Sequence, residues 1–415
     1  MNDDSFASTP RPLPLQGIRV LELGQLLAGP FAGTILGYFG AEVIKVEPPG
    51  AGDPIRNWRL LDEGTSVWWR SLGRNKKCLT IDLRLEEGRD LVRRLAGTTD
   101  VLIENFKPGT LEKWGLGPED LEAGNPGLIF ARVSGYGQTG PKSHLPGYAS
   151  VCEGVGGLRY LNGRKGEPPM RPNLSLGDTL AGIHTALGIC LALIGRLRHR
   201  EDGAESSGGG RGQVVDVSIV ESIFNCLEAV VPEYDRFGAI REPAGATITG
   251  VVPSNTYPTA DGGYVIVGAN GESNYRRLMI RAGRPDLAED PRLQSNAGRV
   301  AHQQLVDEAI AAWTSSLPAA AVLAALEEAD VPAGPINSAA DIFADPQFAE
   351  RGLFEEVETP TGPLKVPAIL PRLAATPGAT RFAGPELGAH NEEVLGGLLG
   401  LGADEIAGLR ARKVI

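Results

Sequence analysis

Cysteine is scarce in this chain of 415 residues, and its few copies stand far apart. The four cysteines form no CxxC pair: Cys78, Cys152, Cys190 and Cys226. Disulfide frameworks and zinc ribbons need closely spaced cysteines, so the spacing excludes both and predicts reduced, partly buried thiols in a reducing compartment. The five histidines form no HxH or HExxH pattern, so we expect no metal site.

Excess basic charge is also lacking. The formal net charge is −11 and no basic stripe interrupts it, which argues against a nucleic-acid partner. The N-terminal stretch "MNDDSFASTPRPLPLQG" has acids where a signal peptide has basic residues, and we find no run of membrane-spanning length. We therefore expect a cytoplasmic protein without a membrane partner, in which an anionic ligand would need a basic pocket of its own.

The N-terminal part alternates the patterns of buried strands and helices. The run "GIRVLEL" at 17–23 predicts a strand, "AGPFAGTILGYFG" at 28–40 a helix, and "AEVIKVEPP" at 41–49 a second strand. This βαβ unit predicts the α/β class with a parallel sheet. Further strands are expected at 77–83, 100–106 and 127–137.

The rest of the chain predicts a second, smaller domain. The glycine- and serine-rich stretch at 200–213 is the strongest flexible segment. Between Thr247 and Ala333 the pattern changes to a hairpin with "DGG" at its turn, followed by helices, which is typical of an α+β domain. We expect three parts: a large domain at 1–225, a linker and the small domain at 226–335, and at 336–415 a second linker and a return to the large domain.

Two loops could receive a ligand. The loop "LGQLLAGP" follows the first strand and opens a helix, where backbone N–H groups can bind phosphate. Its glycines, Gly24 and Gly29, do not match GxGxxG, so a nicotinamide dehydrogenase is disfavoured and a tight turn explains them equally well. The second loop, "VSGYGQTGP" at 133–141, could approach a ligand closely or be a plain turn.

An isolated acid, Asp178, stands in "SLGDTLAG" before an apolar helix. Aspartate is a favoured N-cap, so it could simply start the helix. A carboxylate at a helix N-terminus also stays ionised, and an ionised carboxylate can act as a covalent nucleophile. The local sequence leaves both interpretations open.

Taken in order, these stretches resemble the class III CoA-transferase family (the CaiB/BaiF or formyl-CoA transferase family). The resemblance spans nearly the whole chain. It is carried by "LQGIRVLELGQLLAGPFAGTILGYFGAEVIKVEPPGAGDPIR", "RNKKCLTIDL", "VLIENFKPGTLEKWG", "RVSGYGQTGP", "LGDTLAG", "GRGQVVDVSIVES", "YPTADGGYV" and "VPAGPIN".

The resemblance implies a mechanism and a set of contacts. Asp178 would attack an acyl-CoA thioester and pass through an aspartyl anhydride and an aspartyl-CoA thioester, with acyl-CoA as substrate and no permanently bound cofactor. Tyr136 would face the reacting end. The implied CoA contacts are Leu27, Ala28, Ile81, Arg84, Asn105, Phe106, Lys113, Ser134, Gly135, Tyr136 and Gly137.

The family's fold is implied as well: a homodimer of two interlocked rings. In each subunit a Rossmann-like large domain is built from both termini, and two linkers join a small α+β domain to it. Acyl-CoA and a small carboxylic acid are the implied substrates.

Two departures from formyl-CoA transferase bear on the substrate. A basic residue of that enzyme is Pro48 here, and a glutamine of its first loop is Leu27. The resemblance favours succinyl-CoA as donor and a short dicarboxylic acid as acceptor, chosen at the Gly245–Asn255 loop. The acceptor's second carboxylate would need a cation, for which Arg70, Lys142 and above all Arg171 are candidates.

Two alternatives share the fold or the ligand. An α-methylacyl-CoA racemase needs a second acid–base group, which that family carries in a "GHD" stretch. The matching stretch here is "PGYASV", with Tyr148 in place of the histidine and only His144 nearby. The other alternative is an acyl-CoA-binding protein without catalysis, against which the intact Asp178 loop argues.

Overall fold

The computed structural model describes residues 12–201 and 210–415. Contacts divide the described chain into two compact units. The first unit takes the described residues of Met1–Leu158, Pro172–Glu228 and Glu350–Ile415, and the second takes Arg159–Arg171 and Ala229–Ala349. Most of the glycine-rich stretch, at 202–209, lies outside the described residues.

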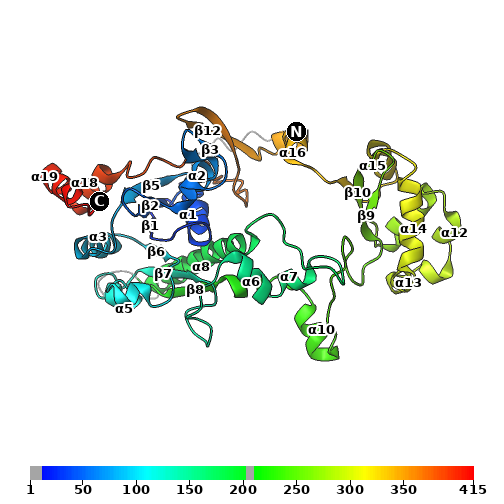
Figure 1. Cartoon of the computed structure of the whole chain (residues 1–415), viewed down its shortest axis with the longest axis horizontal. Coiled ribbons are helices and arrows are strands. Elements are labelled where there is room, and N and C mark those ends of the chain that lie inside the picture. Colours follow the sequence, from blue (N-terminus) through cyan, green and yellow to red (C-terminus); the bar gives the residue numbers. More distant parts are fainter. Residues whose placement is uncertain (1–11, 202–209) are drawn as a thin grey trace. The chain divides into compact units, whose positions relative to one another are not determined.

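A six-stranded sheet forms the centre of the first unit, and every pair of neighbouring strands is parallel (Figure 1). The expected α/β class with a large parallel sheet is therefore confirmed. In sheet order the strands are β5 (Lys76–Thr80), β2 (Glu42–Glu47), β1 (Arg19–Glu22), β6 (Val101–Glu104), β7 (Ile129–Ser134) and β8 (Val214–Ser218).

Helices cover both faces of this sheet, because its strands are apolar on both sides. Val20 of β1 points to the face covered by α1 (Ala28–Tyr38) and α8 (Leu176–Glu201). Leu21, the next residue, points to the other face, with α3 (Glu86–Ala96), α18 (Asn391–Leu399) and α19 (Ala403–Ala411).

Shorter elements complete the first unit. Its two antiparallel hairpins are β3 (Leu61–Asp62) with β4 (Thr65–Ser66), and β12 (Phe354–Thr359) with β13 (Gly362–Pro367). Its short helices are η1 (Pro54–Asn57), α2 (Val67–Leu72), α4 (Thr110–Lys113), α5 (Pro118–Glu122), α6 (Ala149–Val155) and α9 (Ile219–Phe224). Two helices cross the unit boundaries: α7 (Leu158–Leu161) and α17 (Pro346–Glu350).

The second unit is built on an antiparallel sheet in the order β11-β10-β9. The strands are β9 (Ser254–Pro258), β10 (Tyr264–Gly268) and β11 (Ala333–Pro335), and the "DGG" turn joins the first two, as the sequence predicts. The helices are α10 (Val230–Phe237), α11 (Glu272–Arg281), α12 (Pro285–Ala288), η2 (Pro291–Leu293), α13 (Asn296–Ala301), α14 (Gln303–Thr314), α15 (Ala319–Glu328) and α16 (Ala339–Ala344).

Two expectations about helices need correction. The segment Leu176–Arg198 of α8 is long and apolar enough to cross a membrane, so the statement that no run reaches that length is wrong. One such helix is weak evidence for a membrane span, because α8 packs against α1, β7 and β8 as a core helix does. The expected elements also lack α19, which follows Gly402 and buries Ile406 and Leu409.

Candidate active site

Asp178 is the third residue of α8, which begins at Leu176. The carbonyl of Ser175 accepts a hydrogen bond from the Thr179 N–H at 3.1 Å, so the helical pattern already starts before the aspartate. The interpretation of Asp178 as a simple N-cap is therefore wrong. Its carboxylate lies in the first turn, where the helix dipole favours the ionised form.

A pocket of about 330 Å³ opens beside Asp178 at the carboxyl ends of β1, β6 and β7. Ligands of open α/β sheets bind at this edge. Of the residues that the sequence predicts for the site, those that line the pocket are Leu27, Ala28, Asn105, Phe106, Ser134, Gly135 and Asp178.

The helix that carries Asp178 packs very closely on the loop that opens α1. A Cβ at Gly182 would lie 2.9 Å from the carbonyl oxygen of Ala28 and 3.0 Å from Cβ of Phe31. Only glycine allows this approach. Asp178, one helical turn earlier, is thereby held near the Leu27–Ala28 side of the pocket.

The thiol of Cys152 lies close to the site, and its pKa is raised to about 11. Burial is the main cause, followed by the negative charges of Asp178 and Glu153. The thiol is therefore protonated at neutral pH and is no competing nucleophile. All four cysteines are free, as the spacing predicts.

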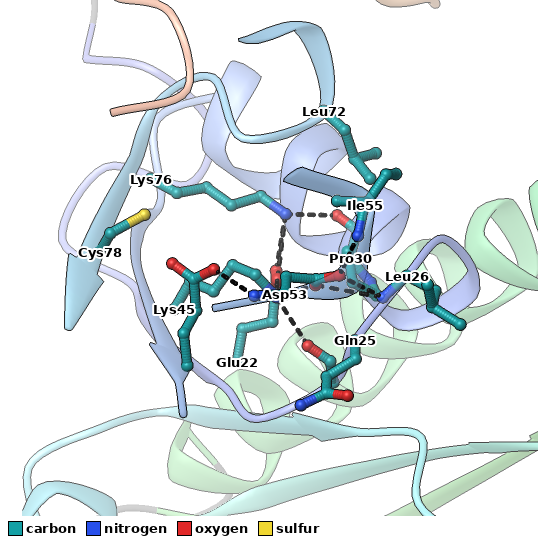
Figure 2. Close-up of polar contacts among 12 residues, drawn as sticks. Glu22, Gln25, Leu26, Pro30, Lys45, Asp53, Ile55, Leu72, Lys76 and Cys78 are labelled. Carbon is teal, nitrogen blue, oxygen red and sulfur yellow. Dashed lines mark hydrogen bonds and ion pairs between the residues drawn. The ribbon is translucent and has the colours of Figure 1, made fainter. Parts of the chain in front are cut away.

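The loop after β1 is fixed from several sides (Figure 2). The side chain of Asn105 accepts from the Gln25 N–H at 2.8 Å and donates to the Gln25 carbonyl at 2.7 Å. Leu26 has a φ of 64°, in the left-handed region that residues other than glycine seldom adopt. Its N–H donates to both carboxylate oxygens of Asp53, at 3.1 Å each.

Asp53 belongs to a cluster of four fully buried charges, Glu22, Lys45, Asp53 and Lys76 (Figure 2). Lys45 Nζ lies 2.9 Å from Asp53 and 3.1 Å from Glu22, and it donates to the Gly24 carbonyl at 2.7 Å. Lys76 Nζ lies 2.9 Å from Glu22 and donates to the Pro30 carbonyl at 2.6 Å.

The two lysines of this buried charge cluster differ in pKa. Burial lowers the pKa of Lys45, but the nearby carboxylates of Asp53 and Glu22 outweigh burial and raise it above its usual value. Burial also lowers the pKa of Lys76, and there Glu22 does not fully offset it. Asp53 is thus the partner of a firmly charged lysine.

The glycine loop after β7 brings two backbones into contact. A Cβ at Gly135 would lie 2.8 Å from Cα of Gly147, so neither position has room for a side chain. The hydroxyl of Ser134 accepts a hydrogen bond from the Gly137 N–H at 2.8 Å. Gly135 and Gly147 both line the pocket, so this close crossing forms part of its wall.

Other predicted residues lie outside the pocket lining. Ile81, Arg84, Lys113, Tyr136 and Gly137 are not among its described lining residues. Arg84 is exposed and paired with Asp82 at 2.7 Å. Arg171 belongs to the second unit.

The remaining cation candidates for the acceptor carboxylate also lie away from the pocket lining. Arg70 is buried, donating to the Gly384 carbonyl at 2.8 Å and to Glu386 at 2.6 Å. Lys142 is exposed and does not line the pocket either.

Several lining residues were not predicted individually from the sequence, chiefly Gln25, Leu26, Lys107 and the Pro146–Tyr148 segment. Lys107 places a cation in the pocket. It directly follows Asn105 and Phe106, which were predicted to contact CoA, so its place in the "ENFKPG" stretch already indicated that it lies near the site.

The family follows from comparison with known proteins. A model of the family described as CoA-transferase family III matches residues 15–391. The chain belongs to CoA-transferase family III.

Named relatives of this family III chain are CoA-transferases. It is 48% identical over 406 residues to the succinyl-CoA–D-citramalate CoA-transferase of Chloroflexus aurantiacus, covering 97% of this chain and 98% of the relative. It is 43% identical to the alpha subunit of the succinyl-CoA–L-malate CoA-transferase of Chloroflexus aurantiacus, covering 97% and 93%. The crystal structure of a CaiB/BaiF family protein from Brucella suis superposes with a TM-score of 0.81 at 33% identity, covering 94% and 100%.

Membership of family III makes the chain a CoA-transferase, and CoA thioesters are the substrates of such enzymes. The described residues that line the pocket include no histidine, and Tyr148 stands at the place of the racemase histidine. The CoA-transferase interpretation is therefore favoured over the racemase and over a binding protein without catalysis.

Proposed function

We propose that this CoA-transferase moves CoA from succinyl-CoA to a second dicarboxylic acid, with Asp178 as the nucleophile. The observation that carries the proposal is the position of Asp178, which lies in the first turn of α8 and lines a pocket together with Leu26–Ala28 and Ser134–Gly135. The relatives named for succinyl-CoA with citramalate or malate support the choice of substrates.

The reaction needs four attacks and no external oxidant or base. The Asp178 carboxylate attacks the thioester carbonyl, and the CoA thiolate leaves as a mixed anhydride forms. The thiolate then attacks the aspartyl carbonyl, which releases succinate and gives an aspartyl-CoA thioester. The acceptor carboxylate attacks that thioester and expels CoA again, and a final thiolate attack on the acceptor acyl group regenerates Asp178.

The substitution Asp178→Asn tests the proposal. It keeps the shape of the side chain but removes its negative charge, so we expect transfer to fall by about 1000-fold or more, with CoA affinity retained. The matched control is Asp120→Asn, which changes an aspartate of α5 outside the pocket and should retain activity. Mass spectrometry after incubation with succinyl-CoA should find a CoA adduct on the Asp178 peptide of the parent protein and of Asp120→Asn, but not on the corresponding peptide of Asp178→Asn.

The assembly is part of the proposal. The interlocked-ring homodimer agrees with an exposed apolar face of α8, which a second copy would cover. The residues of this face are Ile183, Leu187, Leu191, Ile194 and Leu197. The domain boundaries and the cytoplasmic location stay predictions.

A further inference from the structure

We propose that the buried charge cluster holds the loop after β1 in place beside Asp178, and that Asp53 is a positioning residue for CoA transfer. The inference rests on the proposed function, because it concerns the same pocket. Figure 2 shows the four charged side chains next to Gln25 and Leu26 of the loop, with dashed contacts to it. None of the four charged side chains lines the pocket.

The loop after β1 adopts an unfavourable backbone conformation at Leu26. A leucine at φ 64° stays there only where its surroundings determine it, and such residues gather at functional sites. Leu26 lines the pocket together with Asp178, and the carboxylate of Asp53 receives its N–H.

The buried charge cluster joins the loop to the rest of the first unit. Lys45 on β2 contacts Asp53 and the Gly24 carbonyl, so the N-terminal end of the loop is held by the sheet. Lys76 on β5 contacts Glu22 and the Pro30 carbonyl, so the first turn of α1 is held by the same charges. A Cβ at Gly33 would lie 1.9 Å from Glu22, so α1 leaves room for the carboxylate.

Stability alone does not explain the buried charge cluster. Burying two lysines and two carboxylates carries a large desolvation penalty, and well-packed apolar side chains often serve stability as well or better. The presence of four such charges next to the loop is explained by the position that they impose on the left-handed Leu26. Supporting residues of this kind keep catalytic groups within fractions of an ångström of their working geometry.

The experiment compares Asp53→Asn with Asp100→Asn. Asp53 lies near the carboxyl end of β1, where it accepts the N–H groups of Leu26 and Ile55 and contacts Lys45. Asp100 lies at the amino end of β1, where it accepts the Arg19 N–H at 2.9 Å and contacts Arg196 at 2.7 Å. We expect Asp53→Asn to lower kcat for succinyl-CoA-dependent transfer by roughly 10- to 100-fold, with the KM for succinyl-CoA changed by less than about threefold. Asp100→Asn should leave kcat unchanged.

Substitutions of Leu26 supply a second test. If Asp53 only stabilised the fold, the kcat values of these variants would not depend on the backbone conformation at Leu26. Glycine adopts φ 64° without strain, whereas valine resists it. We expect Leu26→Val to have a kcat at least about fivefold below that of Leu26→Gly. We also expect Asp53→Asn to cost at least about threefold less activity in the Leu26→Gly background than in the parent protein.

These measurements separate the possible failures. Equal kcat losses in Asp53→Asn and Asp100→Asn, or equal kcat values for Leu26→Val and Leu26→Gly, overturn the inference and leave the proposed function intact. The Leu26 pair decides the matter if Asp53→Asn does not fold. Absence of any turnover by the parent protein would contradict the proposed function itself.

Discussion

At the scale of single residues, the geometry of the site depends on the absence of a side chain at Gly182. Gly182 stands one turn after Asp178, and a side chain there would press on the backbone of Ala28. The distance between the proposed nucleophile and the loop after β1 is therefore set by a glycine that is not among the described residues lining the pocket.

Gly182→Ala should accordingly reduce both stability and catalysis. The added methyl group has to displace α8 or α1, and overpacking of this kind typically costs about 1–3 kcal/mol of unfolding free energy. We expect kcat to fall together with the urea midpoint of unfolding. Gly195→Ala is the matched control in the same helix: a Cβ there meets nothing within 4 Å, so it should be neutral or slightly stabilising. A full kcat in Gly182→Ala would contradict this account of the packing.

The sequence could point to Asp178 but not to Asp53. An acid before an apolar helix is visible locally, whereas the left-handed Leu26 and its bond to Asp53 arise only when residues 27 positions apart meet. A signal did exist: Glu22 and Lys45 are charges inside strands that otherwise read as fully buried.

At the scale of elements, the carboxyl ends of β6 and β7 carry a second buried ion pair. Glu104 accepts from Arg132 Nε at 2.8 Å and from the Phe106 N–H at 2.7 Å. Burial raises the pKa of Glu104 to about 7, although Arg132 opposes the rise. The charge of Glu104, and with it the ion pair at these strand ends, therefore changes near neutral pH.

This shift predicts a pH-dependent stability. The unfolded state releases the Glu104 proton near 4.5 and the folded state near 7, so stability should fall as pH rises between these values, by roughly 3 kcal/mol. Glu104→Gln should flatten that slope in urea unfolding. Glu112→Gln is the control on the same arginine: the Glu112 pKa is lowered, so its contribution is lost as pH falls. Parallel curves for the parent protein and Glu104→Gln would refute the assignment.

Strands and long helices were predictable because their period and apolar content are local properties. The parallel sheet follows from the alternation of β-branched runs with amphipathic helices. The nine-residue α19 was missed because its amphipathic signal is short, with only Ile406 and Leu409 buried. The start of α8 could not be fixed from the sequence for a similar reason, since Gly177 weakens the helical pattern before Asp178.

At the scale of the whole molecule, the exposed apolar face of α8 concerns assembly. Leu187 and Leu191 are more than half exposed, at 54% and 59%, although they belong to a helix that is long and apolar enough to cross a membrane. A continuous apolar face of this kind is typical of an interface between subunits.

Charges placed on that face should therefore dissociate the proposed homodimer. We expect the double substitution Leu187→Glu and Leu191→Glu to shift the protein from dimer to monomer in sedimentation-velocity experiments, because a buried, unpaired carboxylate is strongly unfavourable. Ile280→Glu, at a residue of α11 that is 48% exposed, is the control of similar exposure. A monomeric parent protein, or a double variant that stays dimeric, would exclude this interface.

The outermost strand of the parallel sheet has a consequence for synthesis on the ribosome. The Thr80 N–H on β5 donates to Asn391 at 2.9 Å, and Asn391 returns a bond to the Thr80 hydroxyl. These partners are 311 residues apart. At typical translation rates, Asn391 is therefore synthesised on the order of half a minute after β5. During that interval the nascent chain presents a bare strand edge, and chaperones have a defined segment to protect.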